Sequence, residues 1–184
     1  ESLSAKAVIC ALPVERACRV AAPEVQSGDA RFDAMATAAF SPILGVHIEF
    51  DRPVLHRPHA VLVDRPTQWL FRKDAAGRRL HAVISAADEW VDLPEAEIVH
   101  RVASDCRACL PDAAGAAVVW SRVVKERRAT FAATPEFDRR RPANTGERPG
   151  SVVLAGDYTA TDWPATMEGA VRSGRAAAAL IAAT

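Results

Sequence analysis

The sequence predicts a mixed α/β fold with α+β character in its middle, and three observations carry that prediction. Near each chain end, an apolar run typical of a strand leads into a helix-like segment. Between them, short runs alternate apolar and polar residues and are separated by turn signals. The two ends resemble each other, whereas the middle differs. We therefore expect one lobe built from both chain ends and a second, mainly antiparallel lobe built from the middle.

The first thirty residues predict one strand and one helix. Residues 5–13, AKAVICALP, are expected to form a short, wholly buried strand that stops at a proline. A short helix should follow and end at Pro23. Residues 25–30 are polar, so we expect a loop there.

The middle of the chain predicts several short strands. Residues 46–50 alternate apolar and polar side chains with a period of two, which is typical of a half-buried strand. Three more strands are expected at residues 60–63, 68–73 and 79–85. The last two are joined by a hairpin turn in which Gly77 would supply a positive φ.

A helix is expected over residues 92–111, because Ile98, Val102 and Cys106 share one of its faces. Asp92 can cap its N-terminus, and Pro94 suits its first turn. Residues 116–132 should then form a long strand. Apolar side chains fall on both of its faces near residues 118–120, so we expect that part to be covered on both sides.

The C-terminal part predicts a loop, a strand and a helix. Residues 134–150 are rich in proline, arginine and glycine and should form a loop. Residues 151–155 are expected to form a strand. A second loop should lead to an alanine-rich helix over residues 166–183.

Composition and charge exclude several classes of function. The chain of 184 residues has 23 basic and 23 acidic residues, so its net charge gives no reason to expect a nucleic-acid partner. We interpret the arginines at 127–128 and 139–141 as solvated charge. The longest apolar run, residues 176–183, has eight residues, far fewer than the roughly 18 of a membrane span. We therefore expect a soluble, cytoplasmic protein without a transmembrane segment.

Cysteine and histidine spacings suggest no redox or metal chemistry. No secretory signal is evident, so the four cysteines are expected to be free thiols. Cys106 and Cys109 have the spacing of a redox pair, but they lie late in an expected helix, where they are better explained as packing residues. His56 and His59 lack a third ligand and have a proline between them, so no metal site is expected.

The densest chemical signal is residues 154–174, LAGDYTATDWPATMEGAVRSG. Gly156 lets a ligand approach the backbone closely, and Asp157 at a strand end can accept hydrogen bonds from vicinal hydroxyls. A helix that begins near Thr166 leaves its first N–H groups unpaired and favours negative charge there. The Trp163-Pro164 pair adds a stiff, flat wall. Each feature alone is common in ordinary turns and helices, but in this order they predict a site for an electron-poor, phosphate-bearing ligand.

This segment resembles the C-terminal FAD-binding signature of the flavin amine oxidase and phytoene-desaturase superfamily. In that signature an apolar strand leads to Ala-Gly-Asp, and an aromatic-proline pair precedes a helix that opens Met-Glu-Gly-Ala. AVICALP resembles the returning strand of the cofactor domain, FSPILGVHIEFDRPV the first long strand of the substrate domain, and KERRATFAATPEFDRRRP the segment before the signature. The runs RATFAATP and DWPATMEGAVRSG are most similar to the squalene-associated FAD-dependent desaturases, also called hydroxysqualene dehydroxylases.

The resemblance implies an FAD cofactor and eight residues that would bind it. Asp157 would bind the ribityl chain or lie beside the pyrophosphate, with Gly156 giving it room. The backbone at the start of the helix would meet the pyrimidine edge of the flavin ring, and its dipole would stabilise the anionic reduced form. The Trp-Pro-Ala run would lie near the ring. The eight residues are Gly156, Asp157, Trp163, Pro164, Ala165, Thr166, Met167 and Glu168.

The resemblance also implies an isoprenoid lipid substrate, with hydroxysqualene reduced to squalene by loss of its hydroxyl. A lipid of that kind comes from a bilayer, so peripheral membrane contact is expected. We assign residues 1–29 and 134–184 to the FAD-binding lobe and residues 30–133 to the substrate lobe. The sequence does not identify a catalytic residue, including the acid that would protonate the leaving hydroxyl.

One part of the superfamily pattern is missing. None of the nine glycines forms the Gly-x-Gly-x-x-Gly turn that cradles the FAD pyrophosphate. We therefore expect the chain to be the C-terminal part of a longer flavoprotein whose nucleotide-binding half is absent. Alone, it should bind FAD weakly and be inactive.

Two other interpretations remain open. The signature is shared with carotenoid desaturases of the phytoene type and with amine oxidases, in which Tyr158 and Trp163 could stand before the flavin. A non-catalytic lipid-binding or partner module is a third hypothesis, which the missing glycine-rich turn favours. The intact Gly156-Asp157 and Met167-Glu168-Gly169 residues oppose it.

Overall fold

The computed structural model describes residues 4–146 and 152–183 and divides the chain into two compact units. The terminal unit comprises Glu1–Ala39 and Phe131–Thr184, and the central unit comprises Phe40–Thr130. The predicted mixed α/β class is confirmed. The unit boundaries lie after residues 39 and 130, whereas the sequence suggested 29 and 133. Residues 30–39, which include a helix, therefore belong with the chain ends rather than with the sheet.

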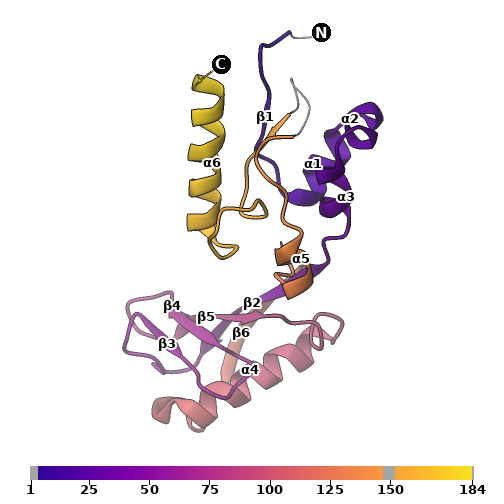
Figure 1. Ribbon diagram of the computed structural model, residues 1–184. Coiled ribbons are helices and arrows are strands. Elements are labelled where there is room, and N and C mark those ends of the chain that lie inside the picture. The colour runs from indigo at the N-terminus through magenta and orange to yellow at the C-terminus, as the bar shows by residue number, and fades with distance from the viewer. Residues whose placement is uncertain (1–3, 147–151, 184) are drawn as a thin grey trace. The chain divides into compact units, whose positions relative to one another are not determined.

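The central unit is built on a five-stranded sheet with strand order β3-β4-β5-β2-β6 (Figure 1). β5 pairs antiparallel with both β2 and β4, and β4 pairs antiparallel with β3. The strands are β2 (Phe40–Phe50), β3 (His59–Val61), β4 (Trp69–Arg72), β5 (Arg79–Ser85) and β6 (Val118–Phe131). Gly77, in the turn between β4 and β5, has the predicted positive φ, 76°.

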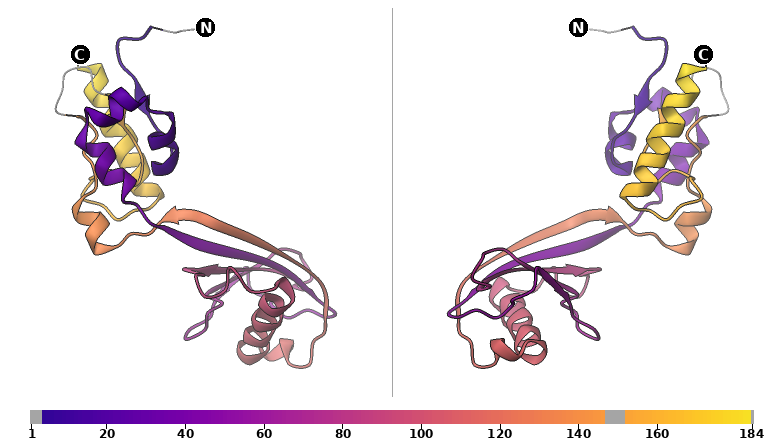
Figure 2. Two further views of the ribbon diagram at one scale, coloured as in Figure 1. Left: turned by 90° about the vertical axis from the view of Figure 1, so that its right-hand side faces the viewer. Right: turned by 90° about the vertical axis from the view of Figure 1, so that its left-hand side faces the viewer.

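One face of this sheet packs against α4 (Glu95–Cys109), as both views in Figure 2 show. Alternate residues of β2 point into the core, and Leu44 and Ile48 are fully buried. Helix α4 contributes Ile98, Val102 and Cys106, the face that its 3.6-residue periodicity predicts. A short 3₁₀ helix, Pro111–Ala113, follows α4.

Two expectations for the central unit are wrong. Asp92 does not cap α4, because the helix begins after Pro94, and the Asp92 carboxylate instead pairs with Arg127 at 2.7 Å. The start of β6 is not covered on both sides, since Val119 and Trp120 are 56% and 47% exposed. β6 is an edge strand in the strand order, which explains why its apolar side chains are left partly uncovered.

The terminal unit holds a short parallel pair of strands, β1 (Ile9–Cys10) and β7 (Val153–Leu154), and the long helix α6 (Met167–Ala182). Figure 1 draws α6 in yellow beside this pair. Ala177 of α6 packs against Val153 and Ala155. The other helices are α1 (Val14–Val20), α2 (Pro23–Ser27), α3 (Ala30–Ala36) and α5 (Pro135–Arg139).

Three details of the terminal unit differ from expectation. The first strand is not wholly buried, because Ile9 is 41% exposed and β1 pairs only with β7 among the described residues. Much of the expected loop over residues 25–30 is helix, since a proline suits the first turn of α2. α5 interrupts the expected loop over residues 134–150, where the Thr134 hydroxyl accepts a bond from Phe137 N. Residues 147–151, which include the start of the last expected strand, lie outside the described residues.

No helix in the described part of the chain is long and apolar enough to cross a membrane.

Candidate functional site

The turn after β7 is held by a buried hydroxyl on α6. Ser173 is fully buried, and its Oγ accepts a hydrogen bond from Gly156 N at 3.0 Å. Its Oγ also lies 2.7 Å from Thr159 Oγ1 and 2.9 Å from Asn144 Nδ2. Asn144 donates in addition to Leu154 O at 2.7 Å. This network fixes the point where the chain leaves β7, because each group has a partner inside a water-poor site.

Tyr158 lies against Gly156 within this turn. A Cβ atom at position 156 would lie 2.7 Å from Tyr158 Cδ1, which real Cβ atoms do not tolerate. Tyr158 is 1% exposed, and its hydroxyl oxygen has no hydrogen-bond partner within residues 4–146 and 152–183. Burial raises the pKa of Tyr158 well above its ordinary value. The glycine is thus required here by the neighbouring ring.

Asp157 sits next in the turn and is partly buried. Burial raises the pKa of its carboxyl group, and three weaker influences oppose the rise: its own backbone N–H, the charge of Arg141, and the N–H of Tyr158. A partly desolvated carboxylate gains more from an added hydrogen-bond donor than an exposed one does. Asp157 is therefore suited to receive a ligand hydroxyl.

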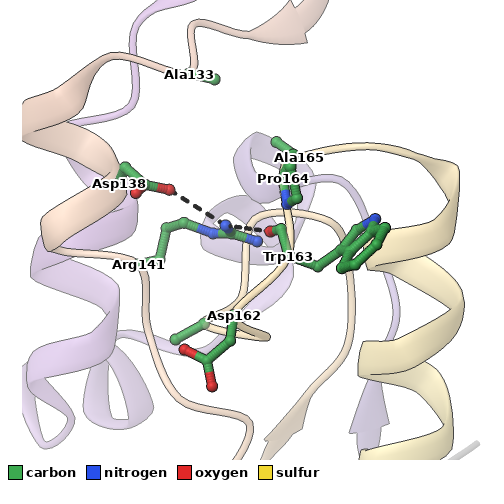
Figure 3. A pocket seen from close by; sticks show the side chains of 8 residues that line it. Ala133, Asp138, Arg141, Asp162, Trp163, Pro164 and Ala165 are labelled. Atoms are coloured by element: carbon green, nitrogen blue, oxygen red, sulfur yellow. Dashed lines mark hydrogen bonds and ion pairs between the residues drawn. The ribbon is translucent and has the colours of Figure 1, made fainter.

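Arg141 joins the two ends of the loop that follows. Its Nη2 donates to Asp157 O at 2.8 Å. Its Nη1 donates to Trp163 O at 2.8 Å and to an Asp138 carboxylate oxygen at 3.2 Å, the two contacts that Figure 3 draws. The Arg141 side chain is 5% exposed. The arginines at 139–141 were expected to be solvated, and this is wrong for Arg141, because its two terminal nitrogen atoms donate to backbone carbonyls of the loop. Arg139 and Arg140 are exposed.

Trp163 is fixed from two directions. Its carbonyl is held by Arg141, and its indole lies 3.9 Å from the guanidinium carbon of Arg172, which pairs with Glu168 at 2.9 Å. A cavity of about 600 Å³ opens beside this loop (Figure 3). It is lined by Ala133, Asp138, Arg141, Ala160, Asp162, Trp163, Pro164 and Ala165.

Thr166 caps the N-terminus of α6. Thr166 Oγ1 accepts from Gly169 N at 3.3 Å, and Thr166 O accepts from Ala170 N at 3.0 Å. The helix therefore begins where the sequence predicts, with Thr166 as its N-cap. The first N–H groups of a helix have no partner within the helix, and Met167 and Glu168 in this first turn are exposed.

The structure thus brings the eight predicted residues into one loop and one helix start. Trp163, Pro164 and Ala165 line the cavity, whereas the other five residues do not. Sequence reasoning missed the residues that hold this loop, Arg141 and Ser173. Nothing in the sequence distinguishes Arg141 from the exposed arginines that precede it, apart from the proline that follows.

The residues present fit a flat cofactor that carries oxygen atoms. Buried side-chain atoms without a partner in the described part of the chain are few, and three belong to this region: Arg141 Nε, Tyr158 OH and Thr161 Oγ1. The exposed first turn of α6 adds backbone N–H groups that have no partner within the helix, and Trp163 with Pro164 adds a flat wall. Within the described residues, no group of three or more His, Cys, Asp or Glu side chains could hold a metal ion.

The sequence matches the family described as "Flavin containing amine oxidoreductase" over residues 1–182. The chain belongs to that family. This confirms the resemblance drawn from residues 154–174. A flavin is the cofactor that the family name states.

Curated relatives narrow the comparison within the flavin containing amine oxidoreductases. Hydroxysqualene dehydroxylase of Sinorhizobium fredii is 42% identical over 143 residues, which cover 77% of this chain and 32% of the relative. The same enzyme of Rhodopseudomonas palustris is 34% identical to this chain, and the match covers 78% of this chain and 33% of the relative. Zeta-carotene desaturase of Capsicum annuum is 36% identical over 108 residues, which cover 59% of this chain and 18% of the relative. The chain spans about a third of the length of the dehydroxylases it matches.

Solved structures of family members share the fold. Cyclohexylamine oxidase from Brevibacterium oxydans superposes on 99% of this chain and 44% of its own, with a TM-score of 0.67 and 18% identity. Putrescine oxidase bound to putrescine covers 97% of this chain and 43% of its own, with a TM-score of 0.65 and 19% identity. At these identities the likeness establishes the fold alone.

Proposed function

We propose that this chain forms part of an FAD-dependent oxidoreductase that reduces hydroxysqualene to squalene. The observation that carries the proposal is the preorganised loop between Asp157 and Trp163, which leads into the exposed N-terminus of α6. The similarity to two hydroxysqualene dehydroxylases supports the choice of substrate. The terminal unit would hold the cofactor and the central unit would bind the lipid.

Each candidate residue has a distinct part in this site. The Asp157 carboxylate would accept a hydrogen bond from a ribityl hydroxyl. The N–H groups of Met167 and Glu168 would donate to oxygen at the pyrimidine edge of the ring, where the dipole of α6 favours the negative charge of the reduced form. Trp163 and Pro164 would exclude water from beside the ring. The chemistry that a bound flavin supplies is the transfer of two electrons.

The reaction balances with a reduced flavin and one proton. The C–O bond of hydroxysqualene breaks, the oxygen leaves as water after taking up a proton, and the carbon gains a hydride equivalent. We assign no residue of this chain as the acid. Since the substrate is a membrane lipid, we propose a cytoplasmic protein that touches the bilayer peripherally.

A carotenoid desaturase is the second candidate, and the similarity to zeta-carotene desaturase favours it. That reaction would run in the opposite electronic direction, because the lipid would lose hydrogen to the flavin. An amine oxidase is less well supported, since the family description and the shared fold point to it but neither the two dehydroxylases nor the desaturase does. A non-catalytic lipid-binding module is the remaining alternative, and it would need no preorganised flavin loop.

Product analysis of the full-length protein tests the proposal. The protein would be supplied with FAD, a reductant and hydroxysqualene under anaerobic conditions, and the extracts examined for squalene by mass spectrometry. Parallel samples would contain phytoene or a polyamine with an electron acceptor. Squalene formation is expected, whereas desaturated carotenoid, aldehyde or no product would each contradict the proposed reaction.

A second measurement concerns the 184-residue chain alone. Without a Gly-x-Gly-x-x-Gly turn for the pyrophosphate, it should bind FAD weakly. Its visible absorption after desalting in excess FAD would show this. Stoichiometric retention of yellow flavin by the isolated chain would contradict this expectation.

A further inference from the structure

We propose that Arg141 is a positioning residue that shapes the Asp157–Trp163 loop for flavin binding, an inference that rests on the proposed flavin site. Its guanidinium donates to a carbonyl at each end of the loop, Asp157 O and Trp163 O, at 2.8 Å in both cases. The two carbonyls are six residues apart in sequence. One side chain therefore closes the loop at its base; Figure 3 draws its bond to Trp163 O.

The planar guanidinium is suited to this task. Two of its nitrogen atoms point in fixed directions toward different carbonyls, while Asp138 shares the charge at 3.2 Å. Because the side chain is 5% exposed, these charge-assisted bonds are shielded from water. A lysine would keep the positive charge but has a single nitrogen atom on a flexible stem. It could not hold both carbonyls in the same geometry.

Binding a carbonyl fixes the whole peptide plane to which it belongs. Arg141 therefore sets the orientation of the peptide after Asp157 and of the peptide that joins Trp163 to Pro164. The next residue extends the same contact, since Pro142 O accepts from Ala160 N at 2.8 Å in the middle of the loop. Residues 141–142 thus support the loop at both ends and at its centre.

The other hydrogen bonds of this region reach the borders of the loop and one residue inside it. Ser173 binds Gly156 N, just before the loop, and the Thr159 hydroxyl within it, while Thr166 binds Gly169 N, just after it. Arg172 touches the Trp163 ring, but its side chain is 46% exposed, so that contact is weaker. Arg141 is therefore the residue whose loss would most disturb the carboxylate of Asp157 and the wall formed by Trp163 while leaving β7 and α6 in place.

Arg31 offers a matched control within the same unit. It is also a buried arginine, 9% exposed, and it donates to two backbone carbonyls, Asn144 O and Val152 O, at 2.7 Å each. Its hydrogen bonds in the described residues do not reach the 157–163 loop, and a lysine would keep the positive charge that acts on Tyr158. Arg31→Lys should therefore destabilise the terminal unit without altering a flavin site. Arg139→Gln is a second control, because Arg139 is exposed and lies two residues away.

The experiment compares Arg141→Lys, Arg31→Lys and Arg139→Gln in the full-length protein. The readouts are the flavin dissociation constant from fluorescence quenching, the visible flavin spectrum, and the urea midpoint. We expect Arg141→Lys to weaken flavin binding about tenfold or more, the size of the loss of one hydrogen bond from a charged group, and to alter the spectrum. Arg31→Lys should lower the urea midpoint and leave flavin affinity unchanged. Arg139→Gln should change neither.

A further variant separates positioning from folding. Arg141→Ala leaves space beside the cavity, so added methylguanidinium should restore part of the flavin affinity if the guanidinium itself orients the loop. Wild-type affinity and spectrum in Arg141→Lys, or equal losses of affinity in Arg31→Lys, would overturn the positioning role alone. Absence of flavin binding by the wild-type full-length protein would instead overturn the proposed function, and this inference with it.

Discussion

The ring of Tyr158 occupies the space into which a side chain on Gly156 would extend. Both residues lie in the turn that follows β7, and the ring is almost fully buried. The glycine at this position therefore serves the packing of the chain itself as well as the approach of a ligand. This double requirement makes the turn sensitive to a single added methyl group.

Gly156→Ala should destabilise the terminal unit by about 1–3 kcal/mol, the usual cost of forcing an extra carbon into a packed site. Urea unfolding followed by circular dichroism would measure it. Gly174→Ala is the matched control, because no atom lies within 4 Å of the added Cβ in α6. That change should be neutral or stabilise the helix by about 0.5–1 kcal/mol. Equal destabilisation by both variants would contradict the role of the Tyr158 ring.

Much of the fold could be predicted because its elements are locally encoded. The range of β5 and the buried face of α4 follow from periodicity, and Gly77 takes the positive φ that its turn requires. The start of α4 could not be predicted in the same way. Asp92 has the position of a cap, but its carboxylate pairs with Arg127, which is distant in sequence. A local sequence pattern does not reveal that a distant residue competes for a side chain.

Thr166→Ala should lower the free energy of unfolding by about 1 kcal/mol, because the hydroxyl that accepts a hydrogen bond from Gly169 N is lost. Thr166→Ser should keep most of that stability, since serine presents the same acceptor. Hydrogen exchange at the first turn of α6 measures the effect locally, and protection should fall in the alanine variant only. Unchanged protection of Gly169 N–H in Thr166→Ala would mean that the cap contributes nothing.

Cys106 should resist thiol reagents in the native protein. It is fully buried in α4, and burial raises the pKa of its thiol to about 12, so thiolate is scarce at neutral pH. Cys109, three residues on, is only partly buried. Peptide mapping after brief alkylation should find label at Cys109 but not at Cys106, and at both in urea. Rapid native labelling of Cys106 would show that α4 opens readily.

His81 should make the central unit less stable as the pH falls below about 6.5, the ordinary pKa of histidine. Burial lowers its pKa, with smaller contributions from the charges of His47 and Lys73; the His47 ring is stacked on it at 4.4 Å. Because the unfolded chain then takes up a proton that folded His81 resists, protons favour unfolding in this window. His81→Gln should flatten the decline in urea midpoint between about pH 7 and pH 5. If the urea midpoint of His81→Gln falls as steeply as that of the wild type, His81 is not the group that causes the loss of stability.

The sequence predicts the residues of the candidate site that would face a ligand, but not the residues that hold them in place. Residues that would face a ligand form a contiguous motif, so Gly156, Asp157 and Thr166 could be singled out from their order. Arg141 and Asn144, which hold these residues in place, lie earlier in the chain than the motif. They contact it only in the folded structure. Burial of Arg141 depends on carbonyls that the loop turns toward it, and no single-sequence pattern encodes that orientation.

Asp157→Asn should improve stability while it weakens cofactor binding. Burial raises the pKa of Asp157, so its contribution to stability is full below the ordinary pKa near 3.9 and is lost as the pH rises through the raised value. At neutral pH the folded chain therefore carries a carboxylate that it disfavours, and the neutral amide relieves this. The urea midpoint should rise in the variant at neutral pH.

The same substitution should reduce flavin affinity in the full-length protein, because a carboxylate accepts hydrogen bonds more strongly than an amide does. Fluorescence titration with FAD measures this, and the opposite movement of the two quantities is the expected signature. Glu168→Gln is the control: Glu168 is exposed and pairs with Arg172, and its proposed role uses its backbone N–H. Flavin affinity that is equal in Asp157→Asn and the wild type would mean that the raised pKa serves no ligand, and that Asp157 is only a turn residue.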